Sequence, residues 1–197
     1  MRYSTGHKAE TRQRVLKEAA KEIRAKGPDN VAVAGIMARA GLTHGGFYAH
    51  FPSKDALVKE AIGTMFADAR ARTEKIDAQG DPRDVLRAYV DFYLSPAHRD
   101  SRDRGCPLPT LSGDFARSQP ATRDRFGAGV EAIAGRLAEP LARLGHADAQ
   151  AESHALLAQL VGGVALARAV GDPVLSDALL ADTRASITRR YGLEIAQ

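Results

Sequence analysis

The chain has 197 residues and a mass of 21.1 kDa, enough for one domain or for a small module fused to a larger one. Hydrophobic residues make up 44% of it and charged residues 26%, a composition that excludes wholesale disorder and a collagen-like fibre. Its apolar runs are too short for a transmembrane helix, and a single cysteine excludes an internal disulfide. We therefore expect a cytoplasmic protein with no signal peptide and no membrane contact.

The net charge of +4 is distributed unevenly along the chain. Residues 1–54 contain ten Lys or Arg and four Asp or Glu, a net charge of +6, which leaves −2 for the remainder. A basic segment on a mildly acidic body indicates a polyanion as the partner of that segment. The same charges also fit the solvated face of an ordinary helix.

Apolar residues recur at helical spacing from one end of the chain to the other. Between Lys8 and Lys26 they occupy one helix face, and Gly27 and Pro28 end that helix. Ser53 is a suitable N-cap for a long helix from Lys54 to about Ile76. No alternating strand pattern occurs, and residues 96–105 are polar enough to predict a mobile loop. The sequence therefore predicts an all-α fold of about nine helices, the others being near 31–40, 44–51, 82–93, 106–117, 120–144, 147–170 and 173–191.

The segment from Val31 to Lys54 has the pattern of a helix-turn-helix. Ala40 is small enough for a second helix to cross it closely, and Gly41 can adopt the left-handed conformation of a tight turn. Leu42 is expected to point into the core, and Thr43 to cap the second helix. This order of residues is typical of a DNA-binding unit.

The second short helix, residues 44–51, contains unusual residues for a purely structural element. Gly45 and Gly46 each cost roughly 1 kcal/mol in a helix, which makes sense where the surface approaches a groove floor closely. Phe47 and Phe51 are spaced to anchor the inner face. Tyr48 and His50 are donors suited to phosphate oxygens, although both also fit simple packing against the next helix.

The run Ala40-Gly41-Leu42-Thr43-His44-Gly45-Gly46-Phe47-Tyr48-Ala49-His50-Phe51-Pro52-Ser53-Lys54-Asp55-Ala56-Leu57 resembles the recognition segment of TetR-family transcriptional regulators. The resemblance covers roughly residues 8–57. It implies a DNA-binding head over residues 1–53 and an effector-binding, dimerising body over 54–197. It also implies that Thr43 caps the recognition helix and touches a phosphate, and that base edges are faced by His44, Gly45 and Gly46. Backbone phosphates would be held by Tyr48, His50 and Lys54.

One departure from the family pattern concerns the first helix of the motif. The family usually has a threonine near the start of that helix as a cap and phosphate ligand, whereas this chain has Ala32. Met37 stands where a small residue is common. Recognition is therefore expected to depend on His44, on the basic arm before Glu10 and on DNA shape.

The body carries no catalytic, nucleotide-binding or metal-binding motif, so we expect neither an enzyme nor a cofactor. Its aromatic residues are the candidate wall of an apolar effector cavity, although each also fits an ordinary core. The site is predicted among Phe66, Tyr89, Phe92, Tyr93, Leu108, Phe115 and Phe126. Cys106 offers an alternative, an oxidant or electrophile switch, if a neighbouring arginine lowers its pKa.

The last two helices are predicted to form a homodimer through a four-helix bundle. The interface is expected at Leu156, Leu160, Val164, Leu175 and Leu179, unless both apolar faces are buried within the monomer. The combined prediction is a repressor released from a palindromic DNA operator by a small apolar or aromatic effector. The alternatives are a regulator switched by Cys106 and an all-helical protein-interaction module with a basic head.

Overall fold

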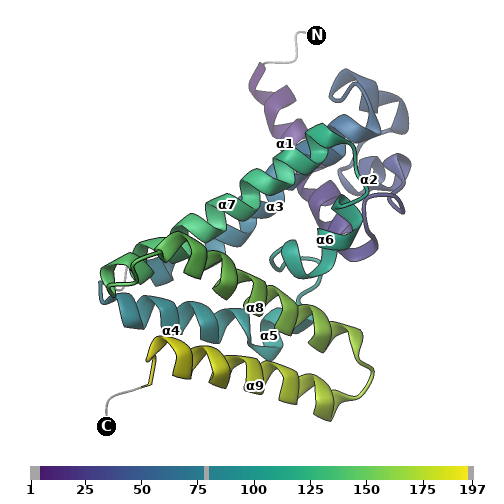
Figure 1. The fold of residues 1–197 in the computed structure, drawn as a ribbon. Helices are drawn as coiled ribbons and strands as arrows, with labels where there is room; N and C mark the ends of the chain where they lie inside the picture. The colour runs from purple at the N-terminus through teal and green to yellow at the C-terminus, as the bar shows by residue number, and fades with distance from the viewer. Residues whose placement is uncertain (1–4, 78–79, 195–197) are drawn as a thin grey trace.

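The computed structural model describes residues 5–77 and 80–194 (Figure 1). These residues form nine α-helices and one 3-10 helix, with no strand among them. The all-α prediction is therefore confirmed. The elements are α1 (Thr5–Lys26), α2 (Val33–Arg39), η1 (His44–Ala49), α3 (Lys54–Asp77), α4 (Pro82–Tyr93), α5 (Pro96–Asp100), α6 (Leu108–Phe115), α7 (Pro120–Arg143), α8 (Ala149–Ala169) and α9 (Pro173–Tyr191).

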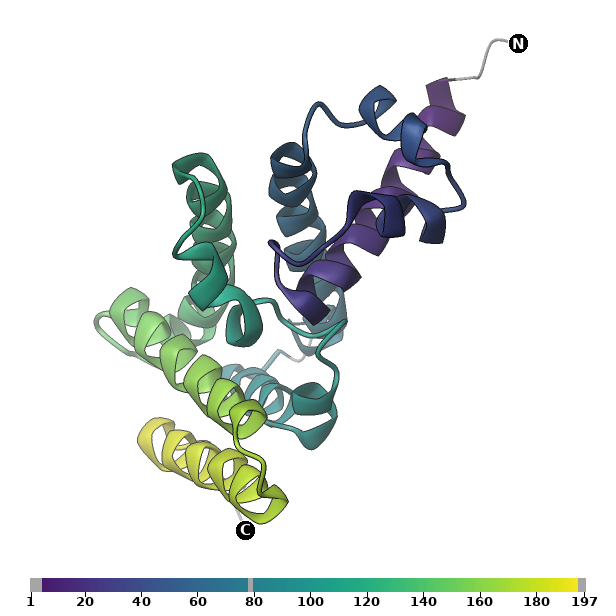
Figure 2. The same ribbon diagram turned by 90° about the vertical axis from the view of Figure 1, so that its right-hand side faces the viewer.

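The head consists of α1, α2, η1 and the beginning of α3, grouped at one end of the molecule (Figure 2). The α1 helix ends at Gly27, whose φ of +80° is a conformation that favours glycine. The expected cap at the start of α3 is present, because the Ser53 hydroxyl accepts a hydrogen bond from the backbone N–H of Ala56 at 3.0 Å. These devices fix where the two long helices of the head begin and end.

The body is built around α7 and α8, with α9 packed on α8 at the end opposite the head (Figures 1 and 2). The α3 helix belongs to both parts, since it packs on α1 in the head and on α7 in the body. One continuous cluster of buried side chains runs from Val15 to Leu193. The core therefore shows no break between residues 53 and 54. A division there is a proposal about function only.

The prediction of a mobile loop over residues 96–105 is wrong in its first half, which forms the short helix α5. Ser95 caps this helix by accepting a hydrogen bond from the backbone N–H of His98 at 3.1 Å, and Pro96 suits its first position. His98 is buried with 4% of its surface exposed. The polar composition of the segment hid a capped turn that packs on the core.

None of the helices within the described ranges has the length and apolar character that a membrane crossing requires.

Candidate nucleic-acid interface and body cavity

The turn between α2 and η1 has the geometry that its sequence predicts. Gly41 adopts a φ of +72°, and the backbone N–H of Leu42 donates to the carbonyl of Met37 at 2.9 Å. Ala40 is buried, and Leu42 packs against the core. Ala32, the N-cap of α2, makes no side-chain cap hydrogen bond.

The second helix of the motif is a 3-10 helix of six residues, not an α-helix. Glycine is a poor α-helix former, and this short segment contains two of them. It adopts the tighter 3-10 conformation instead. Phe47 and Phe51 are buried, with ring centroids 5.8 Å apart, and they anchor this segment as the sequence predicts. The remaining face of η1 is therefore held rigidly at the surface of the head.

The outward face of η1 presents a nearly bare backbone beside one large donor. Tyr48 is 72% exposed, and its ring packs edge-on against Phe47 at 5.2 Å. His44 and Gly45 are exposed, and a Cβ added to Gly45 would meet nothing within 4 Å. Gly46 is half-buried, and a Cβ there would lie 3.8 Å from the Met37 Cε.

The expected role of Thr43 as a side-chain cap is wrong. Thr43 stands at the N-cap position and is exposed, but its hydroxyl makes no cap hydrogen bond. The 3-10 geometry accounts for this, because the backbone N–H of Gly46 already donates to the Thr43 carbonyl at 3.1 Å. The Thr43 side chain is therefore exposed at the edge of η1, with its hydroxyl oxygen 3.9 Å from where a Cβ of Gly46 would lie.

His50 and Lys54 lie where η1 meets α3. His50 is half-buried, and its pKa is lowered by burial and by the nearby charges of Lys8 and Arg12. The Lys54 ammonium donates to the carbonyl of Asp29 at 2.9 Å, which ties α3 to the loop before α2. Arg12 lies over the Phe51 ring at 4.7 Å. Basic side chains of α1 and α3 thus border the face of η1.

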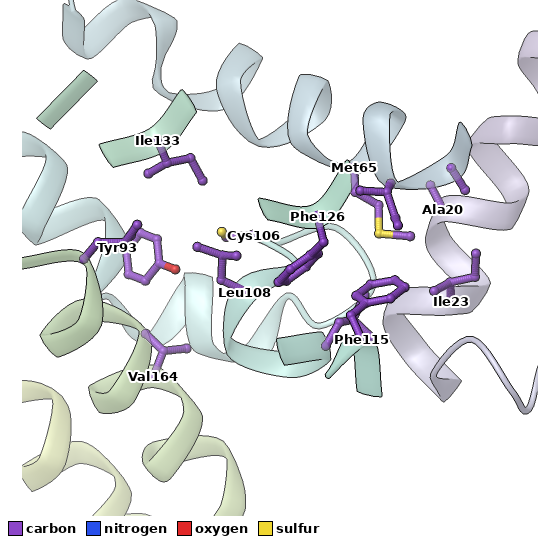
Figure 3. Packing of buried hydrophobic residues seen from close by; sticks show 14 of the residues in the cluster. Ala20, Ile23, Met65, Tyr93, Cys106, Leu108, Phe115, Phe126, Ile133 and Val164 are labelled. Atoms are coloured by element: carbon purple, nitrogen blue, oxygen red, sulfur yellow. The ribbon is translucent and has the colours of Figure 1, made fainter. Parts of the chain in front are cut away.

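A small cavity of about 10 Å³, room for a single water molecule, lies between α3, α4 and α7. Tyr89, Phe92, Tyr93, Cys106 and Ile133 line it, together with Ala69, Arg70, Arg72 and Thr73 of α3 and Arg136 of α7. Tyr93 is 1% exposed, and within the part of the chain that the structure describes its hydroxyl interacts with the Cys106 thiol but makes no well-formed hydrogen bond. Figure 3 shows this hydroxyl directed toward Cys106.

The seven residues expected to form one effector site lie in three places. Tyr89, Phe92 and Tyr93 line the cavity. The three phenylalanines form a separate cluster, with centroids 5.6 Å apart for Phe66 and Phe126 and 4.8 Å apart for Phe115 and Phe126. That cluster fills the core toward α1, as Figure 3 shows for Phe115 and Ile23. Leu108 borders an open groove of about 380 Å³ between α6, α7 and α8.

Cys106 lies in an environment that keeps its thiol protonated. It is 7% exposed, and burial raises its pKa. Its backbone N–H donates to Nε2 of His98 at 3.2 Å. No sequence pattern pointed to His98, because it lies in a segment that reads as a polar loop.

The interface prediction requires a correction. Leu156, Leu160 and Val164 are fully buried within the protomer, so a partner cannot contact them. Leu175 is 47% exposed and Leu179 is half-buried. Sequence periodicity overlooked two further exposed apolar residues nearby, Leu166 at 56% and Val174 at 76%, because both lie off the apolar stripe of their helices.

Comparison with known proteins agrees with this geometry. The family model for bacterial regulatory proteins of the tetR family matches residues 15–61. An uncharacterized HTH-type transcriptional regulator of Bacillus subtilis (strain 168), YdgC, is 37% identical over 67 residues, which span 34% of each chain. The chain thus matches only about a third of that curated relative.

Solved structures extend the likeness to the body. A TetR transcriptional regulator from Chloroflexus aurantiacus is 27% identical with a TM-score of 0.77, over 92% of this chain and 96% of that one. The reduced form of E. coli NemR has a TM-score of 0.79 at 18% identity, over 91% and 96% of the two chains, and shows the same fold. TetR-family proteins are transcriptional regulators and not enzymes. Residues 15–61 thus match the DNA-binding unit of the tetR family of bacterial regulatory proteins, and the chain as a whole is similar in sequence and fold to a solved TetR transcriptional regulator.

Proposed function

We propose that this regulator is a homodimeric repressor that leaves a palindromic operator when a small apolar or aromatic molecule enters its body. The observation that carries the DNA-binding part is the exposed face of η1, where Tyr48 stands beside the side-chain-free surface of Gly45. A surface with so little bulk can approach base edges closely in the major groove.

The division of labour on the head follows from the chemistry of its donors. Tyr48 and Thr43 offer hydroxyl groups to phosphate oxygens, and His50 and Lys54 add donors where η1 meets α3. His44 is the exposed side chain of η1 best placed beside the glycines to read a base edge. Because Gly45 and Gly46 provide no side-chain donors, DNA shape supplies part of the specificity.

The effector part of the proposal is supported by the buried hydroxyl of Tyr93, whose neighbour, the Cys106 thiol, is a weak hydrogen-bond acceptor. Burial raises the pKa of Tyr93 well above its usual value, so the group stays a neutral donor. A buried donor with only a weak acceptor beside it is unfavourable, and a ligand carbonyl or hydroxyl oxygen would satisfy it better. The walls contributed by Tyr89, Phe92 and Ile133 favour an apolar or aromatic body for that ligand.

The cavity as it stands is too small for such a molecule, so binding requires it to expand. We assign this closed cavity to the state that binds operator. Differential affinity of the ligand for an expanded state would then shift the population away from DNA binding.

The dimer is supported by the exposed apolar side chains of Leu166, Val174 and Leu175, which lie where α8 and α9 meet. Exposed apolar groups of this size commonly mark an interface. A two-fold arrangement would present two heads to two half-sites of one operator.

Selection of bound fragments from the source genome, followed by a thermal-shift screen of aromatic, lipophilic and anionic compounds, tests the proposal. An aromatic or lipophilic compound should stabilise the protein and release the selected operator, and Tyr93→Phe should weaken that response. The matched control is Tyr191→Phe, which lies at the end of α9. Stabilisation by phosphorylated or metal-bound compounds alone would contradict the effector assignment.

The burial and raised pKa of Cys106 weigh against the thiol-switch alternative, because the reactive form of cysteine is the thiolate.

A further inference from the structure

The guanidinium of Arg24 joins three segments of the chain at the junction of head and body. Arg24 lies near the end of α1 with 1% of its surface exposed. Its Nη2 donates to the Met65 carbonyl at 3.2 Å and to the Asp68 carboxylate at 3.0 Å, both on α3. Its Nη1 donates to the carbonyl of Asp103, between α5 and α6, at 3.2 Å. One buried cation therefore holds both the head's first helix and a loop of the body.

A series of hydrogen bonds continues from that loop to the cavity. The backbone N–H of Gly105 donates to the Ser101 carbonyl at 2.7 Å, and that of Cys106 donates to Nε2 of His98. Nδ1 of His98 lies 2.7 Å from the Tyr93 carbonyl. A carbonyl only accepts, so Nδ1 carries the proton and Nε2 is the acceptor. The loop that Arg24 holds is thus fixed at its other end to two residues that line the cavity.

A buried arginine is a costly way to fill space. Its charge loses hydration, and an apolar side chain of similar volume fills such a site at least as well. Arg24 donates two of these hydrogen bonds to backbone carbonyls and one to the Asp68 carboxylate. The side chain therefore depends on where the backbone lies in two separate segments. This arrangement suits a residue that keeps two parts of a molecule in register.

We propose that Arg24 is the coupling residue of this regulator. Occupation of the cavity moves Cys106 and the loop of residues 101–105, and Arg24 passes that displacement to α1 and α3, and through them to η1. The identity of the trigger rests on the proposed function, whereas the mechanical link does not. A ligand cannot enter the cavity without moving a wall, and Cys106 is the wall that leads to the loop.

The link can be tested without knowing the effector or the operator, by moving the loop with a substitution. A Cβ at Gly105 would lie 2.8 Å from the Ser101 carbonyl oxygen and 3.1 Å from the His98 ring, so Gly105→Ala must shift the loop. Gly113→Ala on α6 is the matched control, because a Cβ there meets nothing within 4 Å. The readout is amide hydrogen exchange of the full chain, with α9 as the internal reference.

Gly105→Ala should raise exchange at least about threefold in residues 20–27 and 33–51, and Gly113→Ala should leave both segments unchanged. In the Arg24→Lys background, the loop should still respond to Gly105→Ala while the head no longer does, because one ammonium cannot span the contacts of a guanidinium. A head response that persists in the double variant would overturn the proposal.

Should Arg24→Lys fail to fold, the Gly105→Ala map decides alone. A disturbance that reaches residues 20–27 supports the link, and one that stops within residues 98–115 overturns it. Because neither arm uses DNA or a ligand, failure here leaves the proposed repressor function intact, and failure to find an operator leaves this link intact.

Discussion

At the scale of single residues, the same type of side chain has different surroundings in the head and in the body. Tyr48 is largely exposed and Tyr93 is buried, although each lies in a segment rich in aromatic residues. The sequence predicted the outward position of Tyr48 because Phe47 and Phe51 define the inner face of η1. It did not predict the hydrogen bonds of His98 or Arg24, since these join segments far apart in the chain.

Tyr48→Phe removes one hydroxyl donor from the DNA-facing surface. We expect affinity to fall by about 1 kcal/mol, roughly fivefold, on operator and random duplex alike, because a phosphate contact carries no sequence information. Fluorescence anisotropy with both duplexes measures this, and Tyr191→Phe serves as the distant control. A loss confined to the operator would assign Tyr48 to base recognition instead.

His98 makes stability depend on pH. Burial lowers the pKa of its imidazole from 6.5 to about 4. Between these pH values the unfolded chain binds a proton at this position and the folded chain does not. Its contribution to stability is fully present above about pH 6.5 and is lost progressively as pH falls toward 4, by about 3 kcal/mol in total. Urea unfolding at several pH values should show this slope, and His98→Gln should lose it. An unchanged slope in the variant would place the titration elsewhere.

At the scale of elements, glycines on α7 have opposite roles that the sequence does not distinguish. The Phe66 ring of α3 lies against Gly129 so closely that an added Cβ would overlap it, whereas a Cβ at Gly135 meets nothing within 4 Å. Helical periodicity predicted α7 almost to its ends, since local spacing decides a helix. Which glycine receives a neighbouring ring depends on how α3 crosses α7, and no local pattern records that.

Gly129→Ala should destabilise the fold by about 1–3 kcal/mol through overpacking against Phe66. Gly135→Ala should stabilise it by up to about 1 kcal/mol, because alanine is the better helix former at an open position. Urea denaturation of the two variants compares these values directly. Equal effects of the same sign would contradict the close packing of α3 on α7.

At the scale of the whole molecule, the sequence located the helix-turn-helix but not the surface that is free to meet a partner. The helix-turn-helix could be located because turn chemistry and capping are local. The apolar stripe of α8 was assigned to a partner, yet Leu156, Leu160 and Val164 face the protomer's own core. A helix periodicity shows that a face is buried but not what buries it.

The exposed apolar residues between α8 and α9 make the dimer testable without unfolding the protomer. Leu166→Arg should yield a folded monomer, because Leu166 is more than half exposed, and operator binding should be lost with the dimer. Sedimentation velocity measures the assembly, and Ala121→Arg on an exposed position of α7 controls for the added charge. A Leu166→Arg chain that remains dimeric would place the interface elsewhere.

The proposed homodimer binds one palindromic DNA operator through the η1 segments of its two heads. A hydroxyl-radical footprint on the fragment recovered by genomic selection tests it most directly. We expect two protected half-sites, related by a dyad and separated by about one helical turn or a multiple of it. Both should be lost at equal protein concentration in Leu166→Arg. Uniform, salt-dependent protection without a dyad would instead indicate an interaction module with a basic head.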